Sequence, residues 1–262
     1  MRSIQSPFIG APAATKGHFH IDRALLREPN LWVPGKKPIG PVKINWGHPL
    51  SDGLMAFTLL ESLNPYIYGL EVLASTQSGV LTTVTQDGYG IETTASQNDY
   101  ISLGSADALF PDSDKTTIVL IRRLSSSSPP NSTSFGYHVS NGSRVLANLP
   151  HNGNYYFDYG STTTGRTSIS VTVAAIYEVL IFVAGSSKGR EIWQNGVRIA
   201  STPTSLGSRP LASSSDFYIG SAQNSGVSPG ESIYAFGIFD SEWSDIKCIE
   251  FTNNPYQFLI PA

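Results

Sequence analysis

Residues 152–159, NGNYYFDY, bring together the residue types that bind sugars: amides, aromatic rings and a carboxylate. Pyranose rings stack on aromatic side chains, while their hydroxyl groups need amide or carboxylate partners. Alternate side chains of a strand point to opposite faces, so Asn154, Tyr156 and Asp158 share one face and the other three aromatic residues share the opposite one. One face must belong to the core. We therefore predict a glycan site at Asn154, Tyr156 and Asp158.

The remaining acidic residues do not have the spacing that glycoside hydrolysis requires. The reaction needs two carboxylates, about 5–5.5 Å apart in retaining enzymes. The closely spaced set Glu-X-Asp-X-X-Glu is absent, as is a Gly-X-Ser-X-Gly elbow in a strand–turn–helix setting. We expect a non-enzymatic protein, with solvated carboxylates that stand alone near strand ends, at Glu178, Glu191, Asp216 and Glu231.

Calcium is a second candidate ligand, because Asp and Asn side chains on loops provide the oxygen atoms that it prefers. Two loops carry such residues, Asn98 and Asp99 in one and Asp112 and Asp114 in the other. The alternative for these residues is an Asx-type turn without a metal. No other cofactor is predicted, and the five histidines do not form a metal-binding pattern.

The overall composition limits the kinds of partner that the protein can bind and the cellular compartment in which we expect it to be made. Charged residues make up 14% of the 262 residues and the net charge is −3, with scattered basic residues, so nucleic acid is not an expected partner. We find neither a signal peptide nor an apolar run long enough to span a membrane, and we expect synthesis in the cytoplasm. The single cysteine, Cys248, excludes an internal disulfide and is expected to be buried.

The elements that position these residues are predicted to be short antiparallel strands. About a dozen apolar or alternating segments are separated by turns, a spacing typical of a sandwich or barrel. Asn195-Gly196 predicts a two-residue hairpin turn, because both residues tolerate a positive φ.

Residues 76–86 are polar and carry no clear strand signal. The interior glycine of residues 233–239 indicates a bulge or a close approach of the backbone. The predicted strands are 55–60, 89–93, 97–103, 115–123, 135–139, 144–149, 155–159, 168–173, 178–184, 191–193, 197–200, 216–219 and 233–239.

The two ends of the chain differ from this pattern. Residues 1–45 are rich in proline and form a predicted extended arm, with two helical turns at residues 22–28. We expect the arm either to wrap over the sandwich or to dock on a neighbouring subunit or a larger assembly. Near the C-terminus, Ser244 is a predicted N-cap of a short helix, and Trp243 and Cys248 form its hydrophobic staple.

Four segments in this order resemble the concanavalin A-like, laminin-G-type jelly rolls of bacteriophage structural proteins. They are an opening motif NWGHPLSDGL (45–54), QNDYISLG (97–104), the hairpin EIWQNGVRIAS with the strand DFYIGSA (191–222), and YAFGIFDSEWSDIKCIEFTNNPYQFL (234–259). His48 of the opening motif is expected to close a turn. Relatives on this fold include sugar-binding modules, adhesins, capsid decorations and glycosidases, so the fold leaves the function open.

The sequence thus predicts an all-β antiparallel sandwich at residues 46–262, with one short C-terminal helix and an N-terminal arm at residues 1–45. The resemblance implies a virion structural protein, such as a capsid decoration, a minor capsid protein or a tail or fibre component. Residues 1–45 would contact capsid or tail proteins, and the protein is expected to be a homo-oligomer, with a trimer as one form. The alternative is a carbohydrate-binding module or adhesin that recognises a cell-surface glycan, and a glycoside hydrolase is the weakest option.

Overall fold

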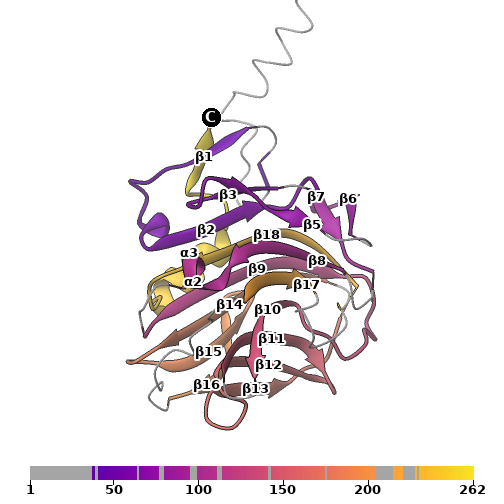
Figure 1. The fold of residues 1–262 in the computed structure, drawn as a ribbon, viewed down its shortest axis with the longest axis vertical. Helices are drawn as coiled ribbons and strands as arrows, with labels where there is room; N and C mark the ends of the chain where they lie inside the picture. Colours follow the sequence, from indigo (N-terminus) through magenta and orange to yellow (C-terminus); the bar gives the residue numbers. More distant parts are fainter. Residues whose placement is uncertain are drawn as a thin grey trace, which may run out of the picture.

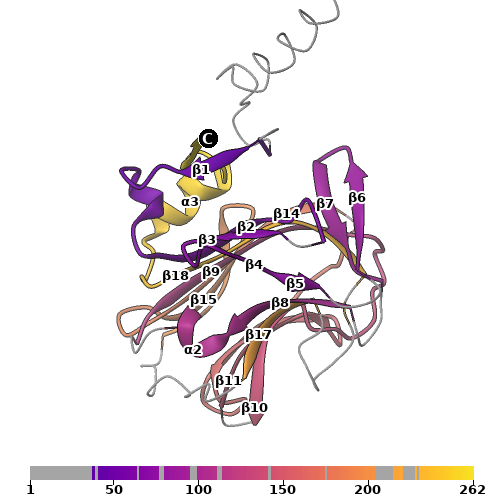
Figure 2. The same ribbon diagram turned by 45° about the horizontal axis from the view of Figure 1, so that its top comes forward.

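The computed structural model contains two antiparallel β-sheets that face each other, as Figures 1 and 2 show. The structure describes residues 37–38, 41–63, 65–76, 80–94, 99–110, 114–140, 143–174, 176–203, 215–220, 228 and 230–262. No helix among these residues is long and apolar enough to cross a membrane.

Within these residues, seven strands form the first sheet in the order β13–β12–β11–β10–β17–β8–β5. Neighbouring strands along this order are antiparallel, and the run from β10 to β13 is a meander of consecutive hairpins. The strands are β5 (Ser75–Thr76), β8 (Tyr100–Ser105), β10 (Phe135–Ser140), β11 (Ser143–His151), β12 (Asn154–Gly160), β13 (Arg166–Ser170) and β17 (Asp216–Gly220).

The second sheet has ten strands in the described part of the chain. Eight follow the order β16–β15–β14–β9–β18–β2–β3–β4, and the β6–β7 hairpin joins β18 through β7. The strands are β2 (Leu54–Leu59), β3 (Tyr66–Tyr68), β4 (Val72–Leu73), β6 (Leu81–Thr85), β7 (Gly88–Glu92), β9 (Thr116–Leu124), β14 (Tyr177–Gly185), β15 (Gly189–Gln194), β16 (Val197–Thr202) and β18 (Glu231–Phe239). The all-β sandwich predicted from the sequence is therefore confirmed.

The main core lies between the two sheets. In β12 the alternation is as predicted, because Tyr155, Phe157 and Tyr159 point into this core. They meet aromatic side chains of the opposite sheet, and the rings of Phe157 and Phe182 have centroids 5.3 Å apart. Strands β9 and β18 are buried on both faces, which explains why their sequences are nearly continuous apolar runs.

A second core covers the outer face of the ten-stranded sheet. It is formed by helix α3 (Asp245–Asn253) and by the pair β1 (Val42–Ile44) and β19 (Leu259–Pro261), which Figure 2 shows above β2 and β18. Ser244 accepts a hydrogen bond from the Lys247 amide, and Trp243 and Cys248 are both buried, so the predicted cap and staple are confirmed. The end of the predicted arm thus pairs with the C-terminal strand.

The sequence signals for turns were accurate. Asn195 and Gly196 have φ values of 50° and 81°, as the predicted hairpin turn requires. His48 closes the turn before a 3-10 helix, η2 (Pro49–Ser51), by accepting a 3.1 Å hydrogen bond from the Leu50 amide at its Nδ1 atom. Gly237 marks a close approach, because a Cβ atom there would lie 2.9 Å from the ring of Phe57.

Several elements were missed. The polar residues 76–86 contain β6, whose threonine-rich sequence forms a ladder with β7 because neighbouring backbone, and not an apolar pattern, holds it. The short β3 and β4 and the single-turn helix α2 (Ala106–Leu109) also carried no clear signal. The predicted helical turns at residues 22–28 lie outside the described residues, as does most of the predicted arm.

Candidate functional site

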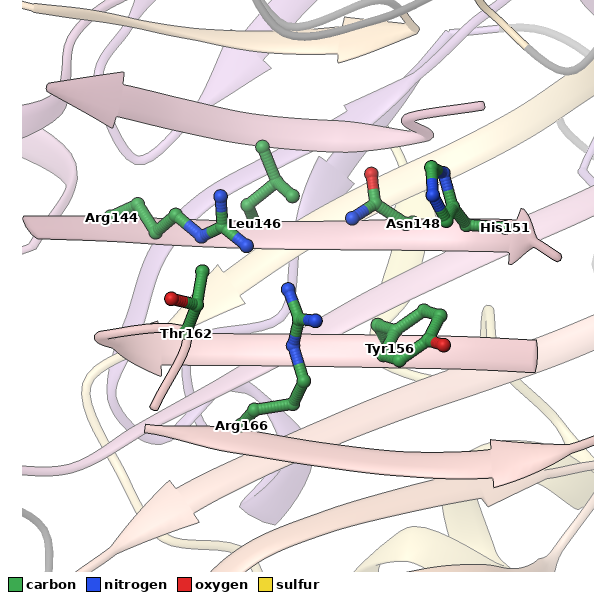
Figure 3. A pocket seen from close by; sticks show the side chains of 7 residues that line it. All are labelled: Arg144, Leu146, Asn148, His151, Tyr156, Thr162 and Arg166. Atoms are coloured by element: carbon green, nitrogen blue, oxygen red, sulfur yellow. The ribbon is translucent and has the colours of Figure 1, made fainter. Parts of the chain in front are cut away.

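A cavity of about 300 Å³ opens on the outer face of the seven-stranded sheet, over β11, β12 and β13. Figure 3 shows its side chains, which project from these strands and from the loop that joins β12 to β13. The lining is polar and cationic apart from one leucine and one aromatic ring. The lining residues are Arg144, Leu146, Asn148, His151, Tyr156, Thr162 and Arg166.

The antiparallel register brings these residues together. Tyr156 is opposite Asn148 of β11, and Asp158 lies between Leu146 of β11 and Arg166 of β13. Directly opposed side chains on one face of a sheet are separated by about 5 Å at Cβ, so three strands can build one compact polar patch. The patch is on the face opposite the core.

Asp158 is fully buried beneath this cavity and is neutralised by two arginines. Arg166 binds it in a bidentate manner, with Nε 2.6 Å from Oδ1 and Nη2 2.8 Å from Oδ2. Arg144 donates a hydrogen bond to Oδ2 from the other side. A buried carboxylate requires such charged partners, and the bidentate geometry fixes the plane of the Arg166 guanidinium group.

Tyr156 forms the aromatic wall of the cavity. The guanidinium carbon of Arg166 lies 4.6 Å from the centre of the Tyr156 ring, a cation–π contact. The imidazole ring of His151 meets the same ring edge-on, with centroids 6.0 Å apart. The hydrogen bond to Asp158 raises the pKa of Arg166 above its ordinary value, so this side chain stays charged.

Two further hydrogen-bond arrangements make the lining rigid. The hydroxyl of Ser161 accepts hydrogen bonds from the backbone amides of Thr163 and Thr164, at 3.1 and 3.0 Å, which fixes the loop that carries Thr162. Thr133 donates a 2.9 Å hydrogen bond to Oδ1 of Asn148. This bond leaves the amide nitrogen of Asn148 as a donor.

The structure separates the three residues of the predicted glycan site. Tyr156 lines the cavity, whereas Asp158 lies below it with both carboxylate oxygens bound by arginine. Asn154 is not a lining residue, and its side chain donates a 2.9 Å hydrogen bond to the Asn152 carbonyl. The sequence analysis missed both arginines. One signal could have found Arg166. It follows the predicted strand 155–159 after a short loop, and a hairpin at that loop places it opposite Asp158.

The predicted calcium ligands are only partly described. Asn98 and Asp112 lie outside the described residues, so the set of four stays a prediction. Asp99 is buried, and its Oδ2 atom accepts 2.5 Å hydrogen bonds from the amide and the hydroxyl of Thr94. Asp114 is exposed. No group of three or more His, Cys, Asp or Glu residues in the described part of the chain could hold a metal ion.

The expectation that the solitary carboxylates are solvated is wrong for Glu178 and Glu231, which are buried around Arg122 at the rim of the core. Arg122 Nη1 lies 2.7 Å from Glu231, and Arg122 Nη2 lies 3.1 Å from Glu178. The hydroxyl of Tyr155 also binds both Arg122 and Glu178. Burial raises the pKa of Glu231 to about 7, although the Arg122 charge acts in the opposite direction.

Glu191 is also buried, but Asp216 is exposed as expected. The Glu191 carboxylate accepts hydrogen bonds from the Trp193 indole at 2.8 Å and from Arg198 at 2.9 Å. These pairs were not visible in the sequence because the alternation of β15 and its register with β16 decide which side chains meet.

A second cavity, of about 330 Å³, lies where the opening motif meets the C-terminal segment. His48 and Pro49 form one wall, and the end of α3 with the following turn forms the other. Gln257 donates a 3.1 Å hydrogen bond to the carbonyl of Glu250. This cavity carries a carboxylate and no arginine or lysine, so it differs in charge from the first. The remaining lining residues are Asn253 and Asn254.

Comparison with known proteins supports the fold and leaves the family open. No protein-family model matches the sequence, and no curated protein matches it. Solved structures do match. The binding domain of Paraclostridial Mosquitocidal Protein 1 superposes with a TM-score of 0.62 at 14% identity, over 79% of this chain and 53% of that chain.

Two other neighbours are similar at the same level. The binding domain of Botulinum Neurotoxin DC, solved in complex with SialylT, has a TM-score of 0.58 and 11% identity over 78% of this chain and 52% of that chain. Trypanosoma rangeli sialidase in complex with sialic acid has a TM-score of 0.60 and 12% identity over 79% of this chain and 33% of that chain. The chain spans about half of these toxin domains and a third of the sialidase. At this level of identity the likeness establishes a shared β-sandwich fold.

Proposed function

We propose that this protein is a non-enzymatic carbohydrate-binding module, and that the cavity over β11, β12 and β13 is its glycan site. The observation that carries the proposal is the composition of one rigid cavity. An aromatic wall, Tyr156, stands beside an amide, an imidazole and guanidinium groups. Aromatic rings bind the apolar faces of sugars, and the polar groups bind hydroxyl groups. A volume of about 300 Å³ accommodates a sugar residue and part of its neighbour.

The structural neighbours support this proposal in two ways. One toxin binding domain was solved with SialylT, and the sialidase was solved with sialic acid. The same toxin domain was also solved with rat synaptotagmin II, so a protein partner is an alternative on this fold. The concave shape of the site favours a glycan, because small ligands bind in cavities of this kind, whereas a protein partner covers a broad surface.

A binding role is also favoured over hydrolysis by the one carboxylate at this cavity. Glycosidases commonly use a pair of carboxylates, one as an acid and the other as a nucleophile or base. Asp158 is the carboxylate closest to the lining in the strand register, and its two oxygens are bound by Arg144 and Arg166. It cannot approach a glycosidic bond without breaking these ion pairs. Its role is to position the arginines.

The experiment is a glycan array probed with the full chain and with Tyr156→Ala. We expect wild-type binding to a defined set of glycans, reduced at least about tenfold in Tyr156→Ala because the aromatic wall is lost. Tyr89→Ala is the matched control, since Tyr89 is an exposed tyrosine on β7 outside the cavity. Thermal melts check that both variants fold. Array binding that Tyr156→Ala leaves unchanged, or no binding at all, contradicts the proposal.

A virion role is compatible with this function, and it rests on the sequence motifs. In that role the protein would be a capsid or tail component whose sandwich presents the sugar site. The strand β1 pairs with β19, so the end of the predicted arm that the structure describes lies beside the C-terminal strand (Figure 1). Attachment to capsid or tail proteins through residues 1–45, trimer formation and location in a virion stay predictions. Immunogold labelling of purified particles tests them.

A further inference from the structure

We infer that the cavity over β11, β12 and β13 selects acidic sugars, and that Arg166 binds the carboxylate of the sugar. This inference rests on the proposed function and names the class of ligand. It comes from the charges and the hydrogen bonds around Asp158. Three observations carry it: a lining that is basic and contains no acidic residue, an unused edge of one guanidinium group, and a rigid setting for that group.

The charged side chains that line the cavity are basic. Two of them, Arg144 and Arg166, bind the same buried carboxylate, Asp158. None of the seven lining residues is acidic. Burial lowers the pKa of a third arginine, Arg190 of β15, and the charge of Asp158 acts in the opposite direction. A basic lining without acidic side chains attracts a carboxylate more strongly than an uncharged sugar.

The geometry of Arg166 provides a specific place for that carboxylate. Its Nε and Nη2 atoms bind the two oxygens of Asp158 along one edge of the guanidinium group. The other edge, with Nη1 and the second hydrogen of Nη2, has no hydrogen-bond acceptor among the described residues. Two parallel N–H groups on such an edge match the two oxygens of a planar carboxylate. The side chain is 31% exposed and lines the cavity.

The setting of Arg166 reduces the entropy that binding would cost. Its guanidinium group is fixed by the Asp158 carboxylate below and by the Tyr156 ring, 4.6 Å from its carbon atom. Figure 3 shows the side chain crossing from β13 over β12, so that its guanidinium group lies on the cavity side of the sheet. A preorganised donor pair loses little conformational freedom when the ligand arrives. Asn148 and Thr162 flank it as partners for the hydroxyl groups of the same sugar.

The second cavity provides an internal contrast. It is of similar volume and also lined by amides, but its charged side chain is Glu250. The same acidic sugar would be repelled there. Acidic selectivity is therefore expected of one cavity alone.

The test uses acidic oligosaccharides and their methyl esters, because esterification removes the charge and leaves the sugar ring unchanged. The probes are trigalacturonic acid and sialyllactose, each beside its methyl ester, and a sulfated disaccharide, measured by calorimetry on the full chain. We expect at least one of the two acids to bind about tenfold or more tightly than its ester. In Arg166→Gln the ratio of the two affinities should fall to about one. Arg166→Lys keeps the positive charge but loses the paired N–H donors of the guanidinium group, so it should give an intermediate ratio.

Arg198→Gln is the matched control, because Arg198 is a partly exposed arginine on β16 that pairs with Glu191. This control should keep the wild-type ratio. Equal binding of acid and ester overturns the inference while Tyr156-dependent binding still supports the proposed function. Tighter binding of the sulfated probe than of either carboxylated one overturns the assignment of a carboxylate. If no glycan binds, both the inference and the proposed function are wrong.

Discussion

Two clusters of charge in this molecule have opposite compositions. In the interior, Arg122 faces two carboxylates, Glu178 and Glu231, and none of the three side chains is more than 1% exposed. On the outer face of the seven-stranded sheet, Arg144 and Arg166 face one carboxylate, Asp158. The first cluster has two carboxylates around one arginine, and the second has two arginines around one carboxylate.

The two clusters resolve their imbalance differently because only one of them reaches solvent. The interior cluster can take up a proton, which is consistent with the pKa of Glu231, raised to about 7 by burial. In the outer cluster the Arg166 side chain is 31% exposed and borders a cavity. A ligand can therefore reach the Arg166 guanidinium group there. This difference supports our proposal that the outer cluster belongs to a binding site, whereas the interior cluster is structural.

The largest effect is expected for Arg122→Ala, which removes the centre of the interior cluster. Two buried carboxylates would then lose their cationic partner, and the hydroxyl of Tyr155 would lose one as well. We expect the free energy of unfolding to fall by about 5 kcal/mol. Urea denaturation measures this loss. A loss below about 1 kcal/mol would mean that water reaches the cluster.

A smaller loss is expected for Asp158→Ala, although it removes the partner of two arginines. Arg166 can turn its guanidinium group toward water because it is already partly exposed, so we expect about 3 kcal/mol. Binding of acidic sugar should weaken as well, since Arg166 loses its fixed orientation. Denaturation and calorimetry on the same sample separate the two effects. A stability loss equal to that of Arg122→Ala would remove the distinction between the two clusters.

A third effect on stability, no larger than that of Asp158→Ala, concerns pH. Burial raises the pKa of Glu231 to about 7 from its ordinary value of 4.5, so the folded protein retains this proton over a range in which the unfolded chain has lost it. The stability contributed by this proton is fully present below pH 4.5 and is lost as the pH rises through 7, by up to about 3 kcal/mol. Glu231→Gln should remove this part of the pH dependence. Urea denaturation between pH 5 and pH 8 compares the two proteins, and parallel curves would contradict the assignment.

Local signals in the sequence were sufficient for much of the fold. The Asn195-Gly196 hairpin, the Ser244 cap and the alternation of residues 155–159 each depend on neighbouring residues, and each is present in the structure. Strand β6 shows the limit of this approach, because its threonines form a strand through pairing with β7 and not through an apolar pattern.

The sites depend on contacts between distant strands, which a single sequence does not display. Arg122 meets Glu178 and Glu231 because β9 lies between β14 and β18 in the sheet. Each carboxylate stands alone in the sequence, so solvation was the natural expectation. The outer cavity is closer to prediction, since Tyr156 was identified from alternation. Its arginines required the register of three strands, which the sequence did not define.

The most direct test of the binding face is to map a bound glycan by NMR on the full chain. A glycan identified on the array would be titrated into labelled protein while the backbone amide shifts are followed. We expect shifts concentrated at residues 144–166, around β11, β12 and β13, with the amides near His48 and Glu250 unchanged. Shifts concentrated at the second cavity instead would contradict the assignment of the binding site.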